Sequence, residues 1–489
     1  MSIANIARGK YHIWTVGCQM NQADSQRVAT ILDGLGWEEV PSMEQANLVI
    51  LNTCSVRAQP EQRAHGQLSL LGHAKKERSD LLVGMMGCMI GNQKTIDNLK
   101  QRYPMVDLFF KVEHADVLPQ FLEDRWTPLA TGDGCIDIEQ VDIERVNPAF
   151  ATQLGRTRTL TVLPMAAPMR PGEREAHYPT QIAPKKGPTA WLPVVLGCNK
   201  VCSYCIVPYR RGRERSRPLA ELLTEARHLI DSGAREVTLL GQTVEAYGLD
   251  LPDQEADLGD LMAELSEIDG LERIRFMTSY PKHMTDKMIR QMAALPKVCE
   301  HVNIPVQSGD DAMLQRMRRG YTLEEYRTLI KKLREWWPEV SLSTDVIVGF
   351  CGETPEEFQH TLDLLAEIRF DVVHVAAYSP RPGTLADKWE DDVPLAEKKR
   401  RLHLVEELQE GIARELNEPY VGRVEDILLE EQVEQHGVKQ WKGRTRTNKL
   451  VFFPDAQADS QSALMPGEVV PVRIERASAW SLQGCAVAI

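Results

Sequence analysis

The sequence lacks several features that would place it in a whole class of protein. No apolar run approaches the ~18 residues of a membrane-spanning helix, and the first ten residues contain no apolar signal-peptide core. A positive charge balance is also missing, since the 489 residues carry a net charge of −13. We therefore expect a cytoplasmic protein without membrane association. Any RNA contact must come from local basic patches rather than from overall charge.

Disulfides are not expected either, because the ten cysteines of a cytosolic chain indicate metal or redox chemistry first. Cys198, Cys202 and Cys205 follow the apolar stretch 191–197 in the order C-x-x-x-C-x-x-C. No fourth cysteine or histidine lies nearby, whereas structural zinc and a [4Fe–4S] cluster both normally take four ligands. Three thiolates would hold a [4Fe–4S] cluster with one iron open. A zinc knuckle with a distant ligand, or three unrelated thiols, are the alternatives.

Strand-like and helix-like runs alternate over residues 10–126, which predicts a doubly wound α/β domain with a parallel sheet. The expected strands are 11–17, 47–52, 81–87 and 106–110. Cys18, Cys54 and Cys88 each come at or just after the end of one of the first three. Ligands of open parallel sheets bind beyond the carboxyl ends of the strands. We therefore predict a second three-thiolate cluster site, against the alternative of three buried structural cysteines.

Composition changes over residues 127–188, where six prolines fall within 164–188. This segment is interpreted as an extended linker. Cys135 lies in it without a partner motif and is interpreted as incidental.

Six strand–helix units follow over residues 189–416 and predict a partial (β/α)6 barrel with its active rim at the carboxyl ends of the strands. Several strand ends are polar or glycine-bearing, namely L-L-G-Q (239–242), P-V-Q-S-G (305–309) and D-V-I-V-G-F-C-G-E (345–353). Such groups can hydrogen-bond a cofactor, and glycine lets backbone approach it. Cys299 and Cys351 have no ligand-like spacing and are interpreted as structural.

Residues 419–489 show short alternating runs at 424–429, 449–453 and 469–474, which predict a small antiparallel β-barrel. The stretch 440–453 carries four cations and no acid beside Trp441 and two phenylalanines. Cations for phosphates and aromatic rings for bases fit RNA binding. An ordinary solvated hairpin is the alternative. A second basic patch is segment 198–217, with six Lys or Arg against one Glu.

These pieces together resemble the radical S-adenosylmethionine (SAM) methylthiotransferases. The matching stretches are T-V-G-C-Q-M-N-Q-A-D-S (15–25), N-T-C-S-V-R (52–57), G-C-N-K-V-C-S-Y-C-I-V-P-Y-R-R-G-R-E-R-S-R-P (197–218), P-V-Q-S-G-D (305–310), R-P-G-T (381–384) and G-R-T-R-T-N-K (443–449). The resemblance implies a methylthiotransferase domain (10–126), a radical SAM core (189–416) and an RNA-binding TRAM-like domain (419–489). Thr243 and Cys351 depart from the family, which often has Asn and Pro there.

The resemblance also implies two [4Fe–4S] clusters and SAM as cofactors. An auxiliary cluster would be bound by Cys18, Cys54 and Cys88, and a SAM-cleaving cluster by Cys198, Cys202 and Cys205. Contacts to SAM are expected from Tyr204, Gln242, Gln307 and Ser308.

The implied reaction adds a methylthio group to carbon 2 of the N(6)-isopentenylated adenosine at tRNA position 37, next to the anticodon. The implied partners are tRNA and a low-potential electron donor, a flavodoxin or ferredoxin, and we expect a monomer. Two alternatives stay open: the same chemistry on an aspartate of a small-subunit ribosomal protein, and an RNA-binding or electron-carrying iron–sulfur protein without turnover.

Overall fold

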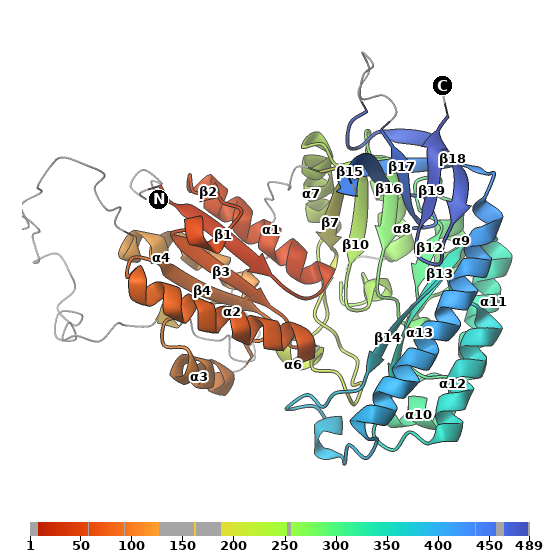
Figure 1. Cartoon of the computed structure of the whole chain (residues 1–489), viewed down its shortest axis with the longest axis horizontal. Coiled ribbons are helices and arrows are strands. Elements are labelled where there is room, and N and C mark those ends of the chain that lie inside the picture. Colours follow the sequence, from red (N-terminus) through yellow and green to blue (C-terminus); the bar gives the residue numbers. More distant parts are fainter. Residues whose placement is uncertain are drawn as a thin grey trace, which may run out of the picture. The chain divides into compact units, whose positions relative to one another are not determined.

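A computed structural model describes residues 8–56, 58–91, 93–126, 161–162, 187–251, 256–435, 437–455 and 464–487. The chain forms two compact units, Met1–Thr180 and Gln181–Ile489, and each is treated by itself (Figure 1). Most of the expected linker 127–188, including Cys135, lies outside the described residues.

The first unit contains a parallel sheet with the strand order β2-β1-β3-β4-β5-β6. Its strands are β1 (Lys10–Thr15), β2 (Glu38–Glu39), β3 (Leu48–Thr53), β4 (Leu82–Gly87), β5 (Leu108–Phe109) and β6 (Thr161–Val162). The order 2-1-3-4-5 is that of flavodoxin-like doubly wound sheets, in which the switch point lies between β1 and β3. The doubly wound prediction is therefore confirmed.

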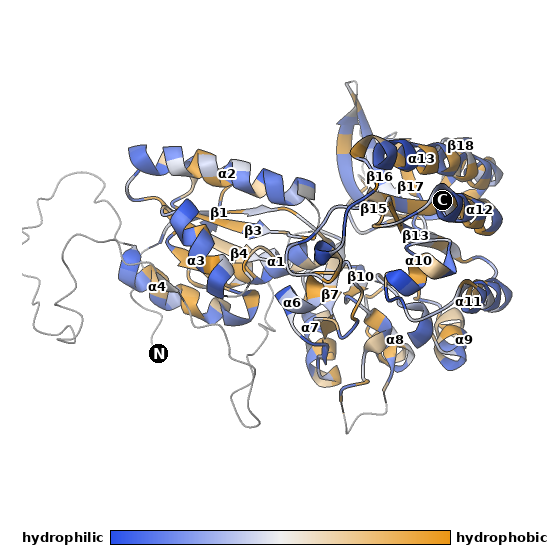
Figure 2. Ribbon diagram, turned by 90° about the horizontal axis from the view of Figure 1, so that it is seen from below, coloured by the Kyte–Doolittle hydropathy of each residue, from blue (hydrophilic) through white to orange (hydrophobic). Residues whose placement is uncertain are grey.

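Burial on both faces explains the apolar sequence of the central strands of this sheet. All six residues of β3 are buried, as expected of a strand covered on both faces, which has a continuous apolar sequence. Helices α1 (Gln19–Gly34) and α2 (Ala58–Glu77) lie on opposite sides of the sheet, and the hydrophobic colouring is strong in β3 and β4 (Figure 2). Helices α3 (Gln93–Arg102) and α4 (Leu118–Arg125) complete the described helices of this unit.

The sequence did not indicate one short strand in the expected linker. Strand β6 lies inside the segment interpreted as an extended connector, and it pairs with β5 through Leu108↔Thr161 and Phe109↔Val162. A strand of two residues has no alternating pattern that sequence inspection could detect.

The second unit begins with six parallel strands. They are β7 (Thr189–Pro193), β10 (Glu236–Leu240), β11 (Arg273–Phe276), β12 (His301–Asn303), β13 (Ser341–Val348) and β14 (Val372–Ala377). Their hydrogen bonds form two three-stranded sheets, β11-β10-β7 and β12-β13-β14. The backbone just before β12 bridges them, because Cys299 N donates to Ile274 O at 2.9 Å. The partial barrel is confirmed, with this break in its ladder.

The predicted first strand of this barrel, 191–197, is divided in two. After β7, a short β8 (Val195–Leu196) pairs antiparallel with β9 (Arg215–Ser216). The segment between β8 and β9 carries the cysteine triplet and the short helix α6 (Val207–Arg211). This segment is therefore a loop whose two ends are held together by the β8–β9 pair.

Helices connect the barrel strands: α7 (Leu219–Asp231), α8 (Leu258–Ser266), α9 (Asp286–Ala294), α10 (Asp311–Arg316), α11 (Leu323–Trp336), α12 (Pro355–Ile368) and α13 (Leu395–Asn417). Capping boxes fix the starts of α11 and α12, through Thr322 with Glu325 and Thr354 with Glu357. None of the described helices combines the length and the apolarity of a membrane span.

The C-terminal part of the second unit is a closed five-stranded barrel with the order β15-β16-β17-β19-β18. Its strands are β15 (Val424–Gln435), β16 (Val438–Arg444), β17 (Leu450–Pro454), β18 (Val469–Ala477) and β19 (Leu482–Ala486). The expected small barrel is confirmed, but it is not wholly antiparallel, because β17 and β19 pair in parallel.

Candidate functional site

In the first unit, the three predicted cysteines come just beyond the carboxyl ends of three adjacent strands. Cys18 follows β1, Cys54 follows β3 and Cys88 follows β4, and these strands are neighbours in the sheet. The ends of β3 and β4 are joined because Thr53 pairs with Gly87 and Cys88 N donates to Thr53 O at 2.7 Å. The trio therefore spans the β1–β3 switch point, where ligands bind in this fold.

Two buried asparagines hold the β1 and β3 ends together. Asn21 Nδ2 donates to Thr53 O at 2.9 Å and to Asn52 Oδ1 at 3.0 Å, and Asn52 Nδ2 donates to Asn21 O at 2.6 Å. The Cys18 thiol lies 3.4 Å from Asn21 Oδ1. Because both asparagines are fully buried, this network fixes the backbone that carries Cys18 and Cys54.

Glycines precede two cysteines of the trio and allow close backbone approach. Gly17 has φ of +131° and Gly87 has φ of +93°, in the region that favours glycine. A Cβ at Gly17 would lie 2.7 Å from Cys54 Cβ, and one at Gly87 would collide with Thr53 O. Any side chain there would push the cysteine loops apart.

In the second unit, the loop of Cys198, Cys202 and Cys205 is fixed by backbone bonds. Gly197 has φ of +75°, and Cys198 N donates to Gly212 O at 3.1 Å. Ser203 is fully enclosed: its Oγ donates to Arg316 O at 2.9 Å, and its N donates to Met317 O at 3.1 Å. The start of the loop is therefore tied to Gly212 at its far end, and its middle to the end of α10.

Burial favours the protonated thiols of Cys198 and Cys205 in the absence of metal. Burial raises the pKa of Cys205 to about 12, and burial also raises the pKa of Cys198 above its usual value. The Cys198 Sγ lies 3.7 Å from Thr243 Oγ1, and Thr243 donates to Glu214 Oε1 at 2.6 Å. Metal binding would have to displace these protons, so metal affinity should decrease as the pH is lowered.

The thiols of each trio suit either an iron–sulfur cluster or zinc, but three ligands are one fewer than structural zinc normally takes, which favours a cluster with one open iron. Within the described ranges, no three Cys, His, Asp or Glu side chains converge closely enough to hold one metal ion. Cluster binding therefore requires the thiols of each trio to turn toward a common point, on a backbone that already brings them to the same rim. The ligand role of all six cysteines stays a prediction.

The four predicted SAM contacts differ in their surroundings. Tyr204 is half-buried and its ring packs edge-on against Phe350 at 6.2 Å, and Gln242 is half-buried at the end of β10. Gln307 has φ of +75° and bridges to Val346. Ser308 is fully buried and accepts from Asp310 N at 3.3 Å. Its hydroxyl thus has a local structural partner, and SAM contact by the four stays a prediction.

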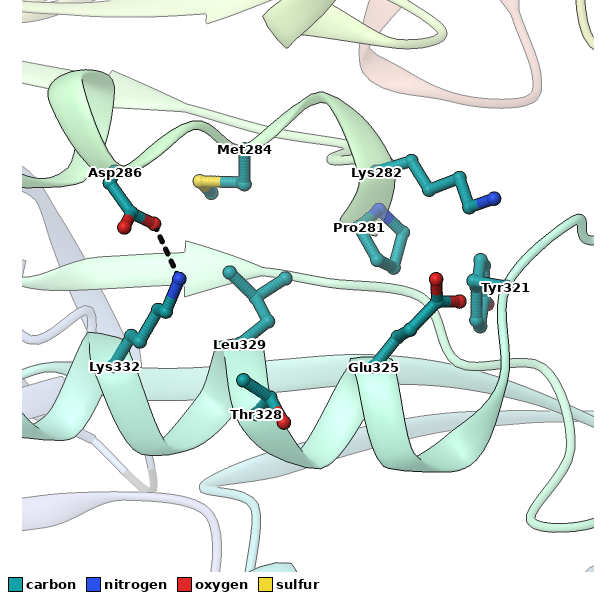
Figure 3. A pocket seen from close by; sticks show the side chains of 9 residues that line it. All are labelled: Pro281, Lys282, Met284, Asp286, Tyr321, Glu325, Thr328, Leu329 and Lys332. Atoms are coloured by element: carbon teal, nitrogen blue, oxygen red, sulfur yellow. Dashed lines mark hydrogen bonds and ion pairs between the residues drawn. The ribbon is translucent and has the colours of Figure 1, made fainter.

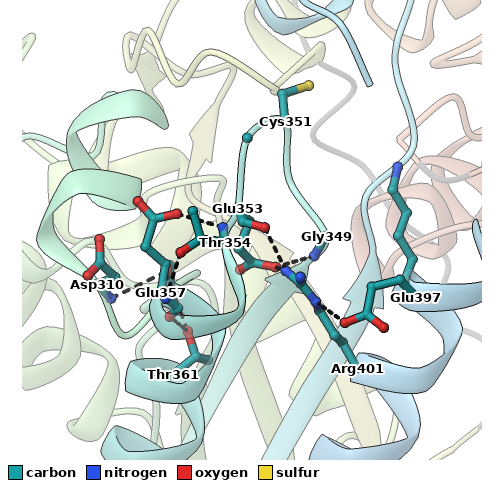
Figure 4. A network of polar contacts seen from close by, with 12 residues as sticks. Asp310, Gly349, Cys351, Glu353, Thr354, Glu357, Thr361, Glu397 and Arg401 are labelled. Atoms are coloured by element: carbon teal, nitrogen blue, oxygen red, sulfur yellow. Dashed lines mark hydrogen bonds and ion pairs between the residues drawn. The ribbon is translucent and has the colours of Figure 1, made fainter. Parts of the chain in front are cut away.

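The glycine-bearing loop after β13 is held by a buried ion pair. Glu353 Oε2 accepts from Gly349 N at 2.5 Å and pairs with Arg401 Nη1 at 2.7 Å (Figure 4). Arg401 also donates to Glu397 at 2.8 Å. Cys351, on the same loop, is buried in an apolar cluster with Phe350 and others. The loop shape is therefore set by α13, and Cys351 has the structural surroundings expected of it.

Sequence inspection missed Arg319, which the structure places against the cysteine loop. Its Nη1 lies 3.4 Å from Cys202 Sγ and 3.4 Å from the Tyr204 hydroxyl. The only sequence signal is the cationic run R-M-R-R, residues 316–319, more than a hundred residues from the cysteines.

A separate small cavity of about 240 Å³ lies between the segment 281–286 and α11 (Figure 3). It is lined by Pro281, Lys282, Met284, Asp286, Tyr321, Glu325, Thr328, Leu329 and Lys332. Lys332 pairs with Asp286 across it at 2.7 Å. No cysteine lines it, so it does not belong to either predicted cluster site.

The basic stretch of the C-terminal barrel has intramolecular partners. Each of its four cations pairs with a carboxylate: Lys442–Glu431 at 2.6 Å, Arg444–Glu430 at 3.0 Å, Arg446–Glu300 at 2.6 Å and Lys449–Asp371 at 2.5 Å. The last two pairs join the barrel to the (β/α) domain. Arg446 and Lys449 therefore dock the barrel. An RNA contact by any of the four cations stays a prediction and would compete with these ion pairs.

Main-chain contacts strengthen this junction. The β11 residue Arg273 donates to Arg444 O and Asp426 O, each at 2.8 Å. Arg275 donates to Thr445 O and Arg446 O, also at 2.8 Å. Both guanidinium groups are buried.

Comparison with known proteins identifies the family. A model of the radical SAM superfamily matches residues 192–365, one of the uncharacterized protein family UPF0004 matches 10–111, and one of the TRAM domain matches 418–487. A tRNA-2-methylthio-N(6)-dimethylallyladenosine synthase of Chloroflexus aurantiacus is 40% identical over 97% of this chain and 91% of its own. The chain belongs to this synthase family. The synthase of Dictyoglomus thermophilum is 41% identical over 97% of this chain and 98% of its own.

A solved structure supports the fold of this synthase family member. The radical SAM methyltransferase TsrM from Kitasatospora setae, with cobalamin and a [4Fe-4S] cluster bound, matches with a TM-score of 0.51. The match covers 77% of this chain and 76% of that chain at 16% identity, so it shows the fold alone. The radical SAM match implies an iron–sulfur cluster and SAM as cofactors.

Proposed function

We propose that this chain adds a methylthio group to carbon 2 of the N(6)-isopentenylated adenosine at tRNA position 37, with two SAM molecules and two [4Fe–4S] clusters. The observation that carries the proposal is the 40–41% identity to synthases of this name over nearly the whole chain. The chain has two cysteine trios: the first follows three parallel strands, and Cys198 of the second lies beside Thr243, just after β10.

The reaction requires a cofactor because the substrate carbon bears an unactivated C–H bond, and no side-chain base has a pKa near enough to remove that proton. When bound, the clusters supply the electron that cleaves SAM and the sulfur that is transferred. The chain's own residues hold and enclose these groups. Cys198, Cys202 and Cys205 would bind one cluster, and Cys18, Cys54 and Cys88 the other.

The partners follow from the same assignment. We propose tRNA as the substrate and a flavodoxin or ferredoxin as the electron donor, because a cluster that cleaves SAM needs a low-potential reductant. The protein is proposed to act as a monomer in the cytoplasm.

Iron analysis after anaerobic reconstitution tests the two sites. We expect about eight irons per chain for the wild type and about four for Cys18→Ala or for Cys198→Ala. Cys485→Ala serves as the matched control, since Cys485 is an exposed barrel residue and its loss should leave the iron unchanged. If the Cys18→Ala variant had the wild-type iron content, the proposal that Cys18 binds an auxiliary cluster would be wrong.

The activity is tested with the reconstituted chain, SAM, dithionite and tRNA that carries the isopentenyl group but lacks the methylthio group. Nucleoside mass spectrometry should detect the methylthio product with the wild type and with Cys485→Ala, and neither Cys18→Ala nor Cys198→Ala should form it. Unmodified tRNA together with a modified aspartate on a small-subunit ribosomal protein would establish the alternative substrate. A wild type that releases no 5′-deoxyadenosine would be an electron carrier or a binding protein.

A further inference from the structure

Arg319 places a buried positive charge next to a predicted cluster ligand. The residue is 6% exposed and lies between α10 and α11. Nη1 contacts Cys202 Sγ and the Tyr204 hydroxyl, each at 3.4 Å. Nη2 donates to Pro305 O at 3.0 Å, and Nε donates to the Tyr321 hydroxyl at 3.1 Å. The guanidinium is thus held on every nitrogen and points one of them at the thiol.

This charge has no carboxylate partner among the residues that the structure describes. Its other neighbours are aromatic rings, with Tyr280 at 5.2 Å and Tyr321 at 5.4 Å from Arg319 Cζ. An unpaired buried charge costs several kcal/mol, and a guanidinium cannot release its proton to avoid that cost.

Three other buried arginines of the same domain are paired with carboxylates, in Arg217–Glu225 at 2.6 Å, Arg275–Glu236 at 2.9 Å and Arg401–Glu353 at 2.7 Å. A fourth, Arg273, donates to the backbone oxygens of Arg444 and Asp426. Arg319 differs from the three paired arginines in that its ionisable neighbours are the Cys202 thiol and the hydroxyls of Tyr204 and Tyr321. Of these groups, the Cys202 thiol becomes an anion when it binds metal, so the cysteine loop can supply the compensating charge.

A cluster on that loop would supply the missing charge. A [4Fe–4S]²⁺ core bound by three thiolates carries a net negative charge, and one-electron reduction makes it more negative. A fixed cation at hydrogen-bond distance from a ligand sulfur stabilises the reduced state more than the oxidised state.

We propose that Arg319 is a positioning residue for the cluster of Cys198, Cys202 and Cys205: it holds the Cys202 thiolate and raises the reduction potential of that cluster. Tyr321 and Pro305 orient the guanidinium, and the Cys202 sulfur accepts a hydrogen bond from its Nη1. The inference rests on the cluster assignment of the proposed function, and its measurement does not depend on tRNA.

The test uses the full chain with Cys18, Cys54 and Cys88 replaced by Ala, so that one cluster gives the whole signal. Redox titration followed by electron paramagnetic resonance compares wild-type Arg319, Arg319→Lys, which keeps the charge, and Arg319→Met, which removes it. Arg319→Met should shift the midpoint to more negative potential and slow 5′-deoxyadenosine release about 10- to 100-fold, whereas Arg319→Lys should keep the midpoint near that of the parent. Tyr321→Phe removes one contact of Arg319 and keeps its charge, so it should shift the midpoint less than Arg319→Met.

An Arg319→Met variant with full iron and an unshifted midpoint would overturn the proposal. If that variant folds by circular dichroism but assembles no cluster, Arg319→Gln decides: iron restored by Lys and not by Gln supports a need for charge, and equal restoration by both refutes it. A parent protein that holds no iron would instead contradict the cluster assignment itself.

Discussion

Gly17→Ala tests whether the left-handed backbone before Cys18 builds the auxiliary cluster site. With φ at +131°, an alanine would be strained by about 1–3 kcal/mol. Its Cβ would also lie 2.7 Å from Cys54 Cβ, and such overpacking costs another ~1–3 kcal/mol. We therefore expect the first unit to lose about 3 kcal/mol of its free energy of unfolding, and the loops of Cys18 and Cys54 to separate.

Two measurements follow this change. Hydrogen–deuterium exchange of peptides covering β3 reports on the first unit alone, and these peptides should exchange faster in Gly17→Ala. Reconstituted iron should fall from about eight to about four per chain, because only the auxiliary site is affected.

Gly34→Ala is the control for the same helix. Gly34 is the last residue of α1 and has no atom within 4 Å of a new Cβ. Gly34→Ala should therefore leave the free energy of unfolding unchanged or raise it by up to about 1 kcal/mol. The β3 peptides of this variant should exchange at the wild-type rate or more slowly. A Gly17→Ala protein with wild-type exchange and about eight irons would show that the cysteine loops do not depend on this backbone conformation.

Three further changes test charges buried in the second unit. Burial raises the pKa of Glu245 to about 7, so its contribution to stability is present below pH 4.5 and is lost as pH rises through 7. In the wild type, the free energy of unfolding should decrease by about 3 kcal/mol over this pH range. Denaturant unfolding of Glu245→Gln should not show this decrease, and equal pH profiles of the two proteins would contradict the prediction. Lys449→Met should lower the unfolding free energy by about 2–3 kcal/mol, since Asp371 is left partly buried without its partner. Adding Asp371→Asn should restore part of that loss, and an unchanged stability in the single variant would contradict the docking role. Arg401→Met should cost about 3–5 kcal/mol in the same assay by leaving Glu353 unpaired, and adding Glu353→Gln should recover part of it, whereas a loss below 1 kcal/mol would count against the pair as the support of the loop after β13.

The sequence allowed the main architecture and the placement of the cysteines to be predicted for one physical reason. Strands buried on both faces have continuous apolar sequences, so Leu48–Thr53 and Leu82–Gly87 could be located without a structure. A cysteine that follows such a strand must lie at the carboxyl rim of a parallel sheet. The two-residue strand β6 could not be located, because it contains no period.

Contacts between distant segments could not be predicted. The cations of 440–453 suggested RNA binding because the segment contains no acid, but their partners Glu300 and Asp371 come from the (β/α) domain. Arg319 likewise reaches Cys202 across 117 positions of sequence. Local composition describes the charge of a segment, and only the fold decides whether that charge faces solvent, a ligand or another part of the chain.

The contacts of Arg273 and Arg275 make the small barrel inseparable from its neighbour. If the barrel were removed, two guanidinium groups on β11 would lose four backbone acceptors, and Arg275 would keep only its pair with Glu236. In a shortened protein these two charges on β11 would be exposed to solvent or left with fewer hydrogen-bond acceptors. The TRAM domain of this protein is for that reason a structural part of its radical SAM domain, and exchanging it for another would require the same carbonyl pattern to be rebuilt.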